Sequence, residues 1–173
     1  MLANYMCEFT PLEEVWFVVS PQNPLKEAHG LLDDDLRLEM TRRALEDFPS
    51  LLASDVEFGM PRPSYTIDTL TRLREMHPDK RFTLIIGGDN WVQFDRWKTP
   101  QQLIRSFQIF IYPRLGEEIV IPESLRESVR PVDAPVIELS STFIRNSIRE
   151  GKNMRAFLPP AVYDFIEAQK LYR

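Results

Sequence analysis

Short apolar runs alternate with segments of helical spacing along this sequence, and this alternation limits the fold more than any other feature. The runs cover residues 15–19, 82–86 and 108–112, and none of them alternates strictly between apolar and polar residues. Continuous runs of this kind are typical of strands whose sheet is covered by helices on both faces. The sequence therefore predicts an α/β fold with a mostly parallel sheet.

Apolar residues at helical spacing predict the helices that connect these strands. The predicted helices cover residues 33–48, 65–76, 141–149 and 160–169, with a further amphipathic helix at residues 1–9. Weaker strand signals occur at residues 56–58 and 136–139. Because no Gly- or Ser-rich linker interrupts the 173 residues, we expect one domain that spans residues 1–173.

The charge and the cysteine content limit which binding partners and which cellular compartment are expected. The formal net charge is -5, and a basic face that would attract nucleic acid or an anionic membrane is therefore not expected. The single cysteine, Cys7, cannot form an internal disulfide, which favours a reducing compartment. No apolar run approaches the roughly 20 residues of a membrane span, and the first residues lack the pattern of a signal peptide. We therefore expect a cytoplasmic protein.

Four segments carry side chains suited to a ligand, because open parallel sheets bind ligands beyond the carboxyl ends of their strands. In residues 20–26, two prolines stiffen a loop that ends in Lys26, whose ammonium can hold a phosphate. In residues 61–66, Ser64 precedes a helix whose free N–H groups can receive a ligand. Taken alone, Lys26 is equally well explained as a solvated lysine, and an N-cap is the favoured explanation of Ser64.

The other two segments favour a nucleotide more strongly. Gly87 and Gly88 permit close backbone approach after the run 82–86, and Asp89 is placed to accept hydrogen bonds from ribose hydroxyls. Trp91 follows them and is predicted to pack in the core rather than to stack on a ring. In residues 139–145, three hydroxyl residues, free N–H groups and a guanidinium converge, which is the arrangement a polyphosphate needs.

Other kinds of site fit the sequence less well. His29 and His77 lack histidine or cysteine partners at zinc-like spacing. The G-x-x-x-x-G-K-[ST] loop does not occur, and the Gly-Gly pair at residues 87–88 is not the G-x-G-x-x-G fingerprint. The acidic run at residues 33–35 is better explained as a helix N-terminus than as a metal site.

Together, the four segments resemble those of the nicotinate-mononucleotide adenylyltransferase family, within the nucleotidyltransferase superfamily that carries an early H-x-G-H and a late S-S-T-x-I-R motif. The resemblance covers essentially the whole chain and implies a Rossmann-like nucleotidyltransferase fold. It implies adenylyl transfer from ATP to nicotinate mononucleotide in NAD biosynthesis, with Mg²⁺ accompanying ATP. The implied ATP-binding residues are Gly87, Asp89, Ser140, Ser141, Thr142 and Arg145. The implied nicotinate mononucleotide-binding residues are Lys26, Ser64, Tyr65, Thr66 and Trp97.

The sequence departs from the family pattern at its beginning. Family members open with a strand, a G-G-x-F loop and H-x-G-H, and only then reach the helix that residues 2–5 resemble. The resemblance therefore names no catalytic histidine, and we expect a sheet without its first strand and little or no activity. An uncovered sheet edge is expected to lower stability or to promote homo-oligomers through that edge. A shortened fragment, a start codon assigned too late and a shortened gene would each give this sequence.

Two alternatives stay open at this stage. A nucleotide-binding protein without catalysis would also lack the histidine motif. A nucleotidyltransferase with another acceptor, such as a pantetheine phosphate, would keep the nucleotide site, although Trp97 and the P-S-Y-T segment at residues 63–66 speak against it. The sequence does not decide between nicotinate and nicotinamide mononucleotide.

Overall fold

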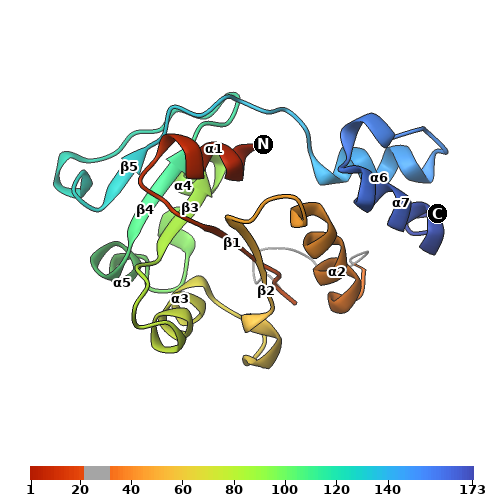
Figure 1. The fold of residues 1–173 in the computed structure, drawn as a ribbon. Helices are drawn as coiled ribbons and strands as arrows, with labels where there is room; N and C mark the ends of the chain where they lie inside the picture. The colour runs from red at the N-terminus through yellow and green to blue at the C-terminus, as the bar shows by residue number, and fades with distance from the viewer. Residues whose placement is uncertain (22–31) are drawn as a thin grey trace.

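The computed structural model describes residues 1–21 and 32–173 and confirms the predicted alternation of strands and helices (Figure 1). The first half contains α1 (Leu2–Phe9), β1 (Val15–Val18), α2 (Asp34–Leu45), β2 (Leu51–Ser54), the 3-10 helix η1 (Val56–Gly59), α3 (Thr66–Met76) and β3 (Thr83–Gly87). The second half contains α4 (Gly88–Val92), η2 (Phe94–Arg96), α5 (Pro100–Ser106), β4 (Gln108–Tyr112), η3 (Glu123–Leu125), β5 (Val129–Pro131), α6 (Ser141–Arg149), η4 (Arg155–Phe157) and α7 (Pro160–Gln169). None of the helices in these residues is long and apolar enough to cross a lipid bilayer.

All strand pairs between the described residues are parallel, as predicted. β1 pairs with β2, with Val15 opposite Leu51. β3 pairs with β4, and β4 pairs with β5, so that the second sheet has the order β3-β4-β5. Within residues 1–21 and 32–173 the strands therefore form a two-stranded sheet and a three-stranded sheet rather than one continuous sheet.

Two weak strand predictions were wrong. Residues 56–58 form part of η1, and the strand lies just before them in β2. The side chain of Glu57 is buried and bonded to two hydroxyls of α3 and the loop before it, which a turn of 3-10 helix permits. Residues 136–139 pair with no described strand, and the last strand is instead β5, whose short Val-Arg-Pro sequence carries little strand signal.

The predicted helices 33–48, 65–76, 141–149 and 160–169 correspond to α2, α3, α6 and α7. Asp33 caps α2 by accepting a hydrogen bond from the backbone N–H of Asp35 at 2.9 Å. Ser140 caps α6 in the same way, because its hydroxyl accepts from the N–H of Phe143 at 3.1 Å. Short polar side chains therefore cap the starts of α2 and α6.

The apolar side chains of the described residues gather in three clusters. The largest lies between β3, β4, β5, α3 and α5, and Leu103, Ile109 and Ile111 in it are completely buried. A second cluster joins α2 to α6 and α7, which lie together at one end of the molecule (Figure 1). The third is small and packs α1 against β1 and β2 around Met6. Helices α1 and α3 lie on opposite sides of the strands (Figure 1), as a sheet covered on both faces requires.

Candidate active site

The carboxyl ends of β3 and β4 hold a tight cluster of polar side chains around Gly87. This glycine ends β3, and a Cβ at its position would collide with Oδ1 of Asp89 and come within 3.2 Å of Nε of Arg114. The Tyr112 ring lies equally near, with its Cζ 3.2 Å from the same point. Only a residue without a side chain therefore lets Asp89 approach the strand end so closely.

Three buried polar atoms have no hydrogen-bond partner among the described residues, and two of them, on Asp89 and Arg114, lie at this end of the sheet. They are Oδ1 of Asp89, Nε1 of Trp97 and Nε of Arg114. The Arg114 Nε and Asp89 Oδ1 atoms lie 3.6 Å apart, which is an ion pair but too long for a hydrogen bond. Because buried polar atoms in folded proteins are almost always bonded, each of these atoms marks a position where a ligand or water completes the bonding.

Arg114 is a candidate functional residue that the sequence reasoning missed. It donates from Nη2 to the Tyr112 hydroxyl at 3.2 Å, and its guanidinium lies 5.2 Å from the centre of that ring. The available signal was its position, because it follows β4 at Tyr112-Pro113 in the way that Asp89 follows β3. A cation and an anion thus lie side by side beyond two neighbouring strands.

The two tryptophans beyond β3 differ in their surroundings. Trp91 packs on Phe94 at 5.2 Å between ring centres and donates from Nε1 to the carbonyl of Val120 at 3.0 Å. The core position predicted for Trp91 agrees with this packing. Trp97 packs on the other side of Phe94 at 5.3 Å, but its N–H is one of the unpartnered atoms. Of these two tryptophans, Trp97 is therefore the one whose indole N–H has no hydrogen-bond partner among the described residues.

The loop before α3 is fixed by a buried carboxylate. Ser64 does not cap α3, because Tyr65 holds that position and makes no side-chain cap bond. Instead, the Ser64 hydroxyl donates to Glu57 at 2.5 Å, and the Thr69 hydroxyl donates to the other carboxylate oxygen at 2.6 Å. The Ser20 and Ser64 hydroxyls lie 3.4 Å apart, so that the end of β1 also meets this group. Glu57 is a second residue that sequence reasoning missed, since it lay in a predicted strand.

Charged contacts attach the same loop to its neighbours. Arg62 donates to Asp34 at 2.9 Å, and Asp34 also pairs with Arg37 at 2.5 Å on α2. The Tyr65 ring lies under the ammonium of Lys98, 4.6 Å from its centre. Neither contact is deeply buried, so each positions the loop more than it stabilises the fold.

The beginning of α6 presents a separate group of donors. The side chains of Ser140, Ser141 and Thr142 are exposed, and the half-buried Arg145 donates to the Thr142 hydroxyl at 3.2 Å. Burial raises the pKa of the Tyr172 phenol, which the nearby positive charges of Arg145 and Arg37 oppose. The helix α6 has nine residues, and its N-terminus is exposed and positively charged.

The structure brings some predicted residues together and leaves others apart. Gly87 and Asp89 form one group, and Ser140, Thr142 and Arg145 form another, but no hydrogen bond of the described residues joins the two groups. Figure 1 shows α6 beside α7, well away from the end of β3. Lys26 lies outside the described residues. No group of three or more His, Cys, Asp or Glu side chains within residues 1–21 and 32–173 is placed to hold a metal ion.

A parallel α/β sheet with a glycine-aspartate turn at a strand end and a basic helix N-terminus is typical of nucleotide-binding domains. The model of the cytidylyltransferase-like family matches residues 2–147. The chain is 50% identical over 165 residues to a "probable nicotinate-nucleotide adenylyltransferase" of Bacteroides thetaiotaomicron, a match that covers 95% of this chain and 81% of the relative. A relative of the same name from Flavobacterium johnsoniae is 43% identical over 177 residues, covering 100% of this chain and 90% of the relative. The chain therefore belongs to the nicotinate-nucleotide adenylyltransferases of the cytidylyltransferase-like family.

Solved structures give the same result for the fold. The nicotinic acid mononucleotide adenylyltransferase of Plasmodium falciparum, complexed with NaAD, aligns with a TM-score of 0.78 over 99% of this chain and 88% of that chain. Its sequence identity is 19%, so this likeness concerns the fold alone. The predicted Rossmann-like nucleotidyltransferase fold is thereby confirmed.

Proposed function

We propose that this chain transfers the adenylyl group of ATP to the phosphate of nicotinate mononucleotide, as a step in the biosynthesis of NAD, at the low rate expected of a sequence in which the H-x-G-H motif does not occur. The phosphate oxygen of the acceptor bonds to the α-phosphorus of ATP, and the bond from that phosphorus to pyrophosphate breaks. The products are nicotinate adenine dinucleotide and pyrophosphate. The names of the relatives at 43% and 50% identity support this reaction over a binding protein without catalysis.

One observation carries the proposal, namely the three unpartnered polar atoms of Asp89, Trp97 and Arg114. The Asp89 carboxylate is suited to accept hydrogen bonds from the ribose hydroxyls of ATP, and Gly87 lets the nucleoside approach the strand end. Trp97 offers a flat ring for the nicotinate and an N–H for an acceptor. Arg114 supplies a fixed positive charge beside Asp89.

The phosphates are assigned to the other group of residues. The free N–H groups and hydroxyls of Ser140, Ser141 and Thr142, with the guanidinium of Arg145, suit the polyphosphate of ATP. Lys26 is proposed to meet a phosphate of the acceptor. On the acceptor side, Ser64 and its bond to Glu57 hold the segment that presents Tyr65 and Thr66 to the nicotinate mononucleotide.

Mg²⁺ enters this scheme with ATP, as part of the substrate. Mg²⁺ is commonly bound through phosphate oxygens with few carboxylates, and the described residues offer no three-ligand cluster of their own. The cation offsets negative charge on the phosphates. The contribution of the protein is then to hold both nucleotides in line and to aim donors at the developing charge. Because ATP is the donor and Cys7 is a free thiol, we place the reaction in the cytoplasm.

Calorimetric titration of the chain with a non-hydrolysable ATP analogue, beside a pyrophosphate-release assay with ATP, Mg²⁺ and nicotinate mononucleotide, tests the proposal. The Arg145→Ala variant should bind the analogue about tenfold to a hundredfold more weakly, because a hydrogen bond to a charged group contributes about 1.5–3 kcal/mol. Arg149→Ala is the matched control, since Arg149 lies one turn later on α6 and bonds to Asn146 at 3.0 Å.

The outcomes separate the functions. Analogue binding that depends on Arg145, together with pyrophosphate release that requires the acceptor, supports the enzyme. Binding without release under any acceptor favours a nucleotide-binding protein. Equal affinity of Arg145→Ala and Arg149→Ala for the ATP analogue would show that the start of α6 does not bind the phosphates.

A further inference from the structure

The side chain of Lys98 makes two contacts that play no part in the proposed reaction. Its ammonium donates to Oδ2 of Asp68 at 2.7 Å and lies over the ring of Tyr65, 4.6 Å from the ring centre. Asp68 and Tyr65 lie one turn apart at the start of α3, where the N–H of Asp68 donates to the carbonyl of Tyr65 at 2.9 Å. One ammonium therefore contacts both a ring and a carboxylate of the same helical turn.

The backbone on both sides of Lys98 is fixed by its neighbours. Before it, the N–H of Trp97 donates to the carbonyl of Phe94 at 3.0 Å, and the Trp97 ring packs on the buried Phe94 ring. After it, Thr99 has a left-handed φ of 48°, and its carbonyl accepts from two N–H groups in the first turn of α5. Lys98 therefore starts from an anchored position, and its side chain reaches from there to α3.

This side chain connects two parts of the proposed acceptor site. Tyr65 belongs to the segment before α3, and Trp97 lies at the end of η2, directly before Lys98. Among the described residues, the bond from Lys98 to Asp68 is the only hydrogen bond between residues 64–68 and residues 94–99. The polar link between the two aromatic residues therefore runs through one lysine.

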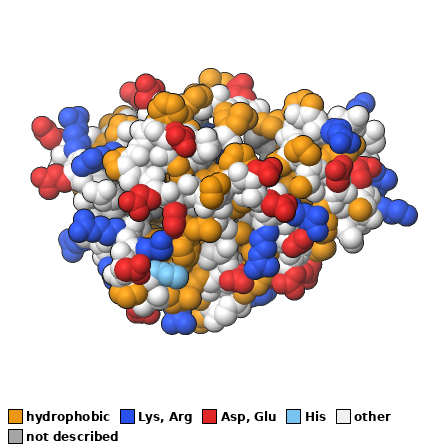
Figure 2. All heavy atoms as spheres, viewed as in Figure 1, with side chains coloured by type: hydrophobic (Ala, Val, Ile, Leu, Met, Phe, Trp, Pro, Cys, Tyr) orange, Lys and Arg blue, Asp and Glu red, His pale blue; other side chains and the backbone are white. Residues whose placement is uncertain are grey.

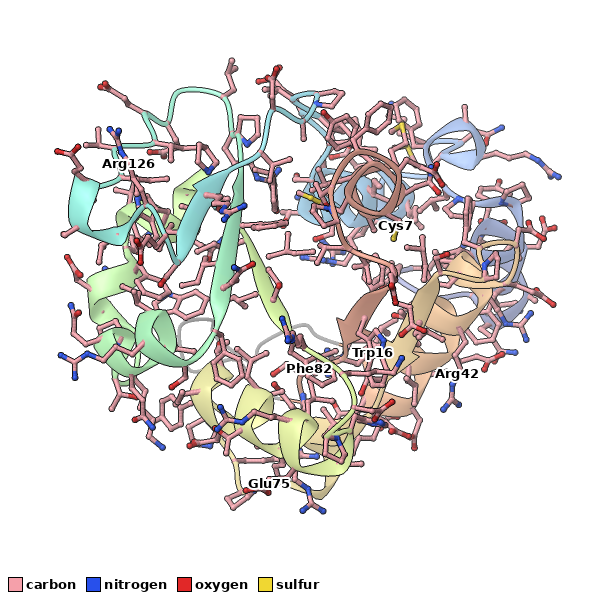
Figure 3. The ribbon with its side chains drawn as sticks, turned by 60° about the vertical axis from the view of Figure 1, so that its left-hand side comes forward. Cys7, Trp16, Arg42, Glu75, Phe82 and Arg126 are labelled. Atoms are coloured by element: carbon pink, nitrogen blue, oxygen red, sulfur yellow. The ribbon has the colours of Figure 1, made fainter. Side chains whose placement is uncertain are left out.

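The contacts of Lys98 lie at the surface between α3 and α5. A groove of about 350 Å³ separates the two helices, and its lining includes Asp68, Glu75 and Lys98. Figure 3 shows α3, on which Glu75 is labelled, next to α5. The side chains of Lys98 and Asp68 are 44% and 46% exposed, and acidic and basic side chains lie close together on the surface over these helices (Figure 2). Either residue can therefore be exchanged without opening the apolar core.

We propose that Lys98 is a positioning residue of the acceptor site, which fixes the ring of Tyr65 relative to Trp97. The inference rests on the proposed function, in which these two side chains meet nicotinate mononucleotide. A tyrosine ring can turn about its side-chain bonds, and a cation held over its face restricts that turning. Because a ring that is fixed in advance loses less freedom when a ligand binds, the affinity for the acceptor rises.

The charge of Lys98 offers a competing explanation for any effect on an anionic acceptor. A lysine attracts the phosphate and the carboxylate of nicotinate mononucleotide at a distance, without fixing any ring. The two explanations predict opposite signs for Asp68→Asn. Attraction alone predicts tighter acceptor binding, because a negative charge is lost. Positioning predicts weaker acceptor binding, because the ammonium of Lys98 loses the carboxylate that holds it in place.

Calorimetric titration with nicotinate mononucleotide alone, and separately with the non-hydrolysable ATP analogue, tests the proposal. Lys98→Met removes the ammonium and should weaken acceptor binding by about threefold to tenfold, with the affinity for the ATP analogue unchanged. Asp68→Asn should weaken acceptor binding as well. Lys98→Arg keeps a cation that can lie over the ring and pair with Asp68, and the adjoining groove has room for it, so this variant should restore acceptor binding.

Lys80→Met is the matched control. The ammonium of Lys80 also pairs with a carboxylate, that of Glu14 at 3.0 Å, and lies over an aromatic ring, that of Trp16 at 6.0 Å from its centre. Neither contact involves a residue of the proposed acceptor site, so the affinity for nicotinate mononucleotide should be that of the natural chain. Urea unfolding of every variant measures stability separately, because a structural role would lower the free energy of unfolding and both affinities together.

The outcomes separate this role of Lys98 from the proposed function. Unchanged acceptor affinity in Lys98→Met, or tighter acceptor binding by Asp68→Asn, would overturn the positioning role and leave the adenylyl transfer in place. Equal weakening of both ligands, or an equal loss in Lys80→Met, would also overturn it. Absence of nicotinate mononucleotide binding by the natural chain would instead overturn the proposed acceptor, and the positioning role with it.

Discussion

At the scale of single residues, the buried carboxylate of Glu57 organises the loop that carries the proposed acceptor site. Only 7% of the residue is exposed, and hydroxyls of Ser64 and Thr69 bond to its two oxygens. Burial of a carboxylate is tolerated only where hydrogen bonds replace those of water. The local fold therefore depends on two hydroxyl donors whose own residues lie on opposite sides of the helix start.

We predict that Thr69→Val destabilises the protein by about 1–3 kcal/mol, because it leaves a buried carboxylate oxygen without its donor at nearly constant volume. Urea unfolding followed by circular dichroism measures the loss. Thr71→Val, two residues later on α3 and half-buried, is the control and should change the free energy of unfolding by less than about 0.5 kcal/mol. Equal losses in the two variants would show that the bond to Glu57 contributes nothing specific.

The Glu14 carboxylate gives the structure a dependence on pH. The hydrogen bond from the Trp16 indole and the contact with Lys80 hold the pKa of Glu14 below its ordinary value of 4.5. A lowered folded-state pKa adds stability above the unfolded value, and that stability is lost as the pH falls through the folded value.

We therefore predict that the free energy of unfolding of the natural chain falls more steeply below pH 4.5 than that of Glu14→Gln. Urea titrations at a series of pH values down to about pH 3 measure both slopes. Glu13→Gln, which changes the exposed neighbour, should keep the steep slope. Parallel curves for the natural chain and Glu14→Gln would contradict the assignment.

At the scale of elements, the sequence predicted what its local signals specify. β3, β4 and the helices α2, α3, α6 and α7 were found where apolar runs and helical spacing placed them. The strands β2 and β5 were not predicted, because β2 has only four residues and β5 only three. Each forms a strand because it pairs with a neighbouring strand of its sheet. Pairing partners distant in the sequence are not visible in a local pattern.

The candidate site shows the same division between local and distant information. Gly87 and Asp89 were predicted because they stand at the end of a strong strand and just beyond it. Arg114 was missed although its Nε lies 3.6 Å from Asp89, since only the parallel pairing of β3 with β4 brings the two ends together. The bond of Ser64 to Glu57 was also missed, because sequence spacing alone favours a helix cap at Ser64.

The start of α2 allows a test of helix capping. The Asp33 side chain accepts from the N–H of Asp35, and two further acids stand in the first turn. We predict that Asp33→Ala lowers the free energy of unfolding by about 1 kcal/mol through loss of the cap. Asp35→Ala removes a charge near the same helix end without removing the cap acceptor, so it should cost about 0.3–1 kcal/mol at low salt and less at high salt. A larger effect in Asp35→Ala would assign the helix start to charge alone.

At the scale of the whole molecule, the apolar core is unevenly divided. The cluster around β3, β4 and β5 contains Leu103, Ile109 and Ile111 at 0% exposure. The cluster that joins α1 to β1 and β2 has three buried members, of which only Met6 is at 0% exposure. Of the four β1 side chains only that of Val15 is buried, and the other three are half-buried or exposed, so that this strand has less apolar area removed from water.

This division predicts different local stabilities for the two sheets, because local opening costs more where more apolar contact is broken. In native-state hydrogen exchange, the amides of β4, which pairs on both sides, should exchange only through global unfolding. The amides of β1 and β2 should exchange faster and through a smaller opening, with little dependence on denaturant. If β1 and β4 exchange alike, the molecule opens as one unit, and the contacts of Trp16 and Glu14 at the amino ends are enough to couple the sheets.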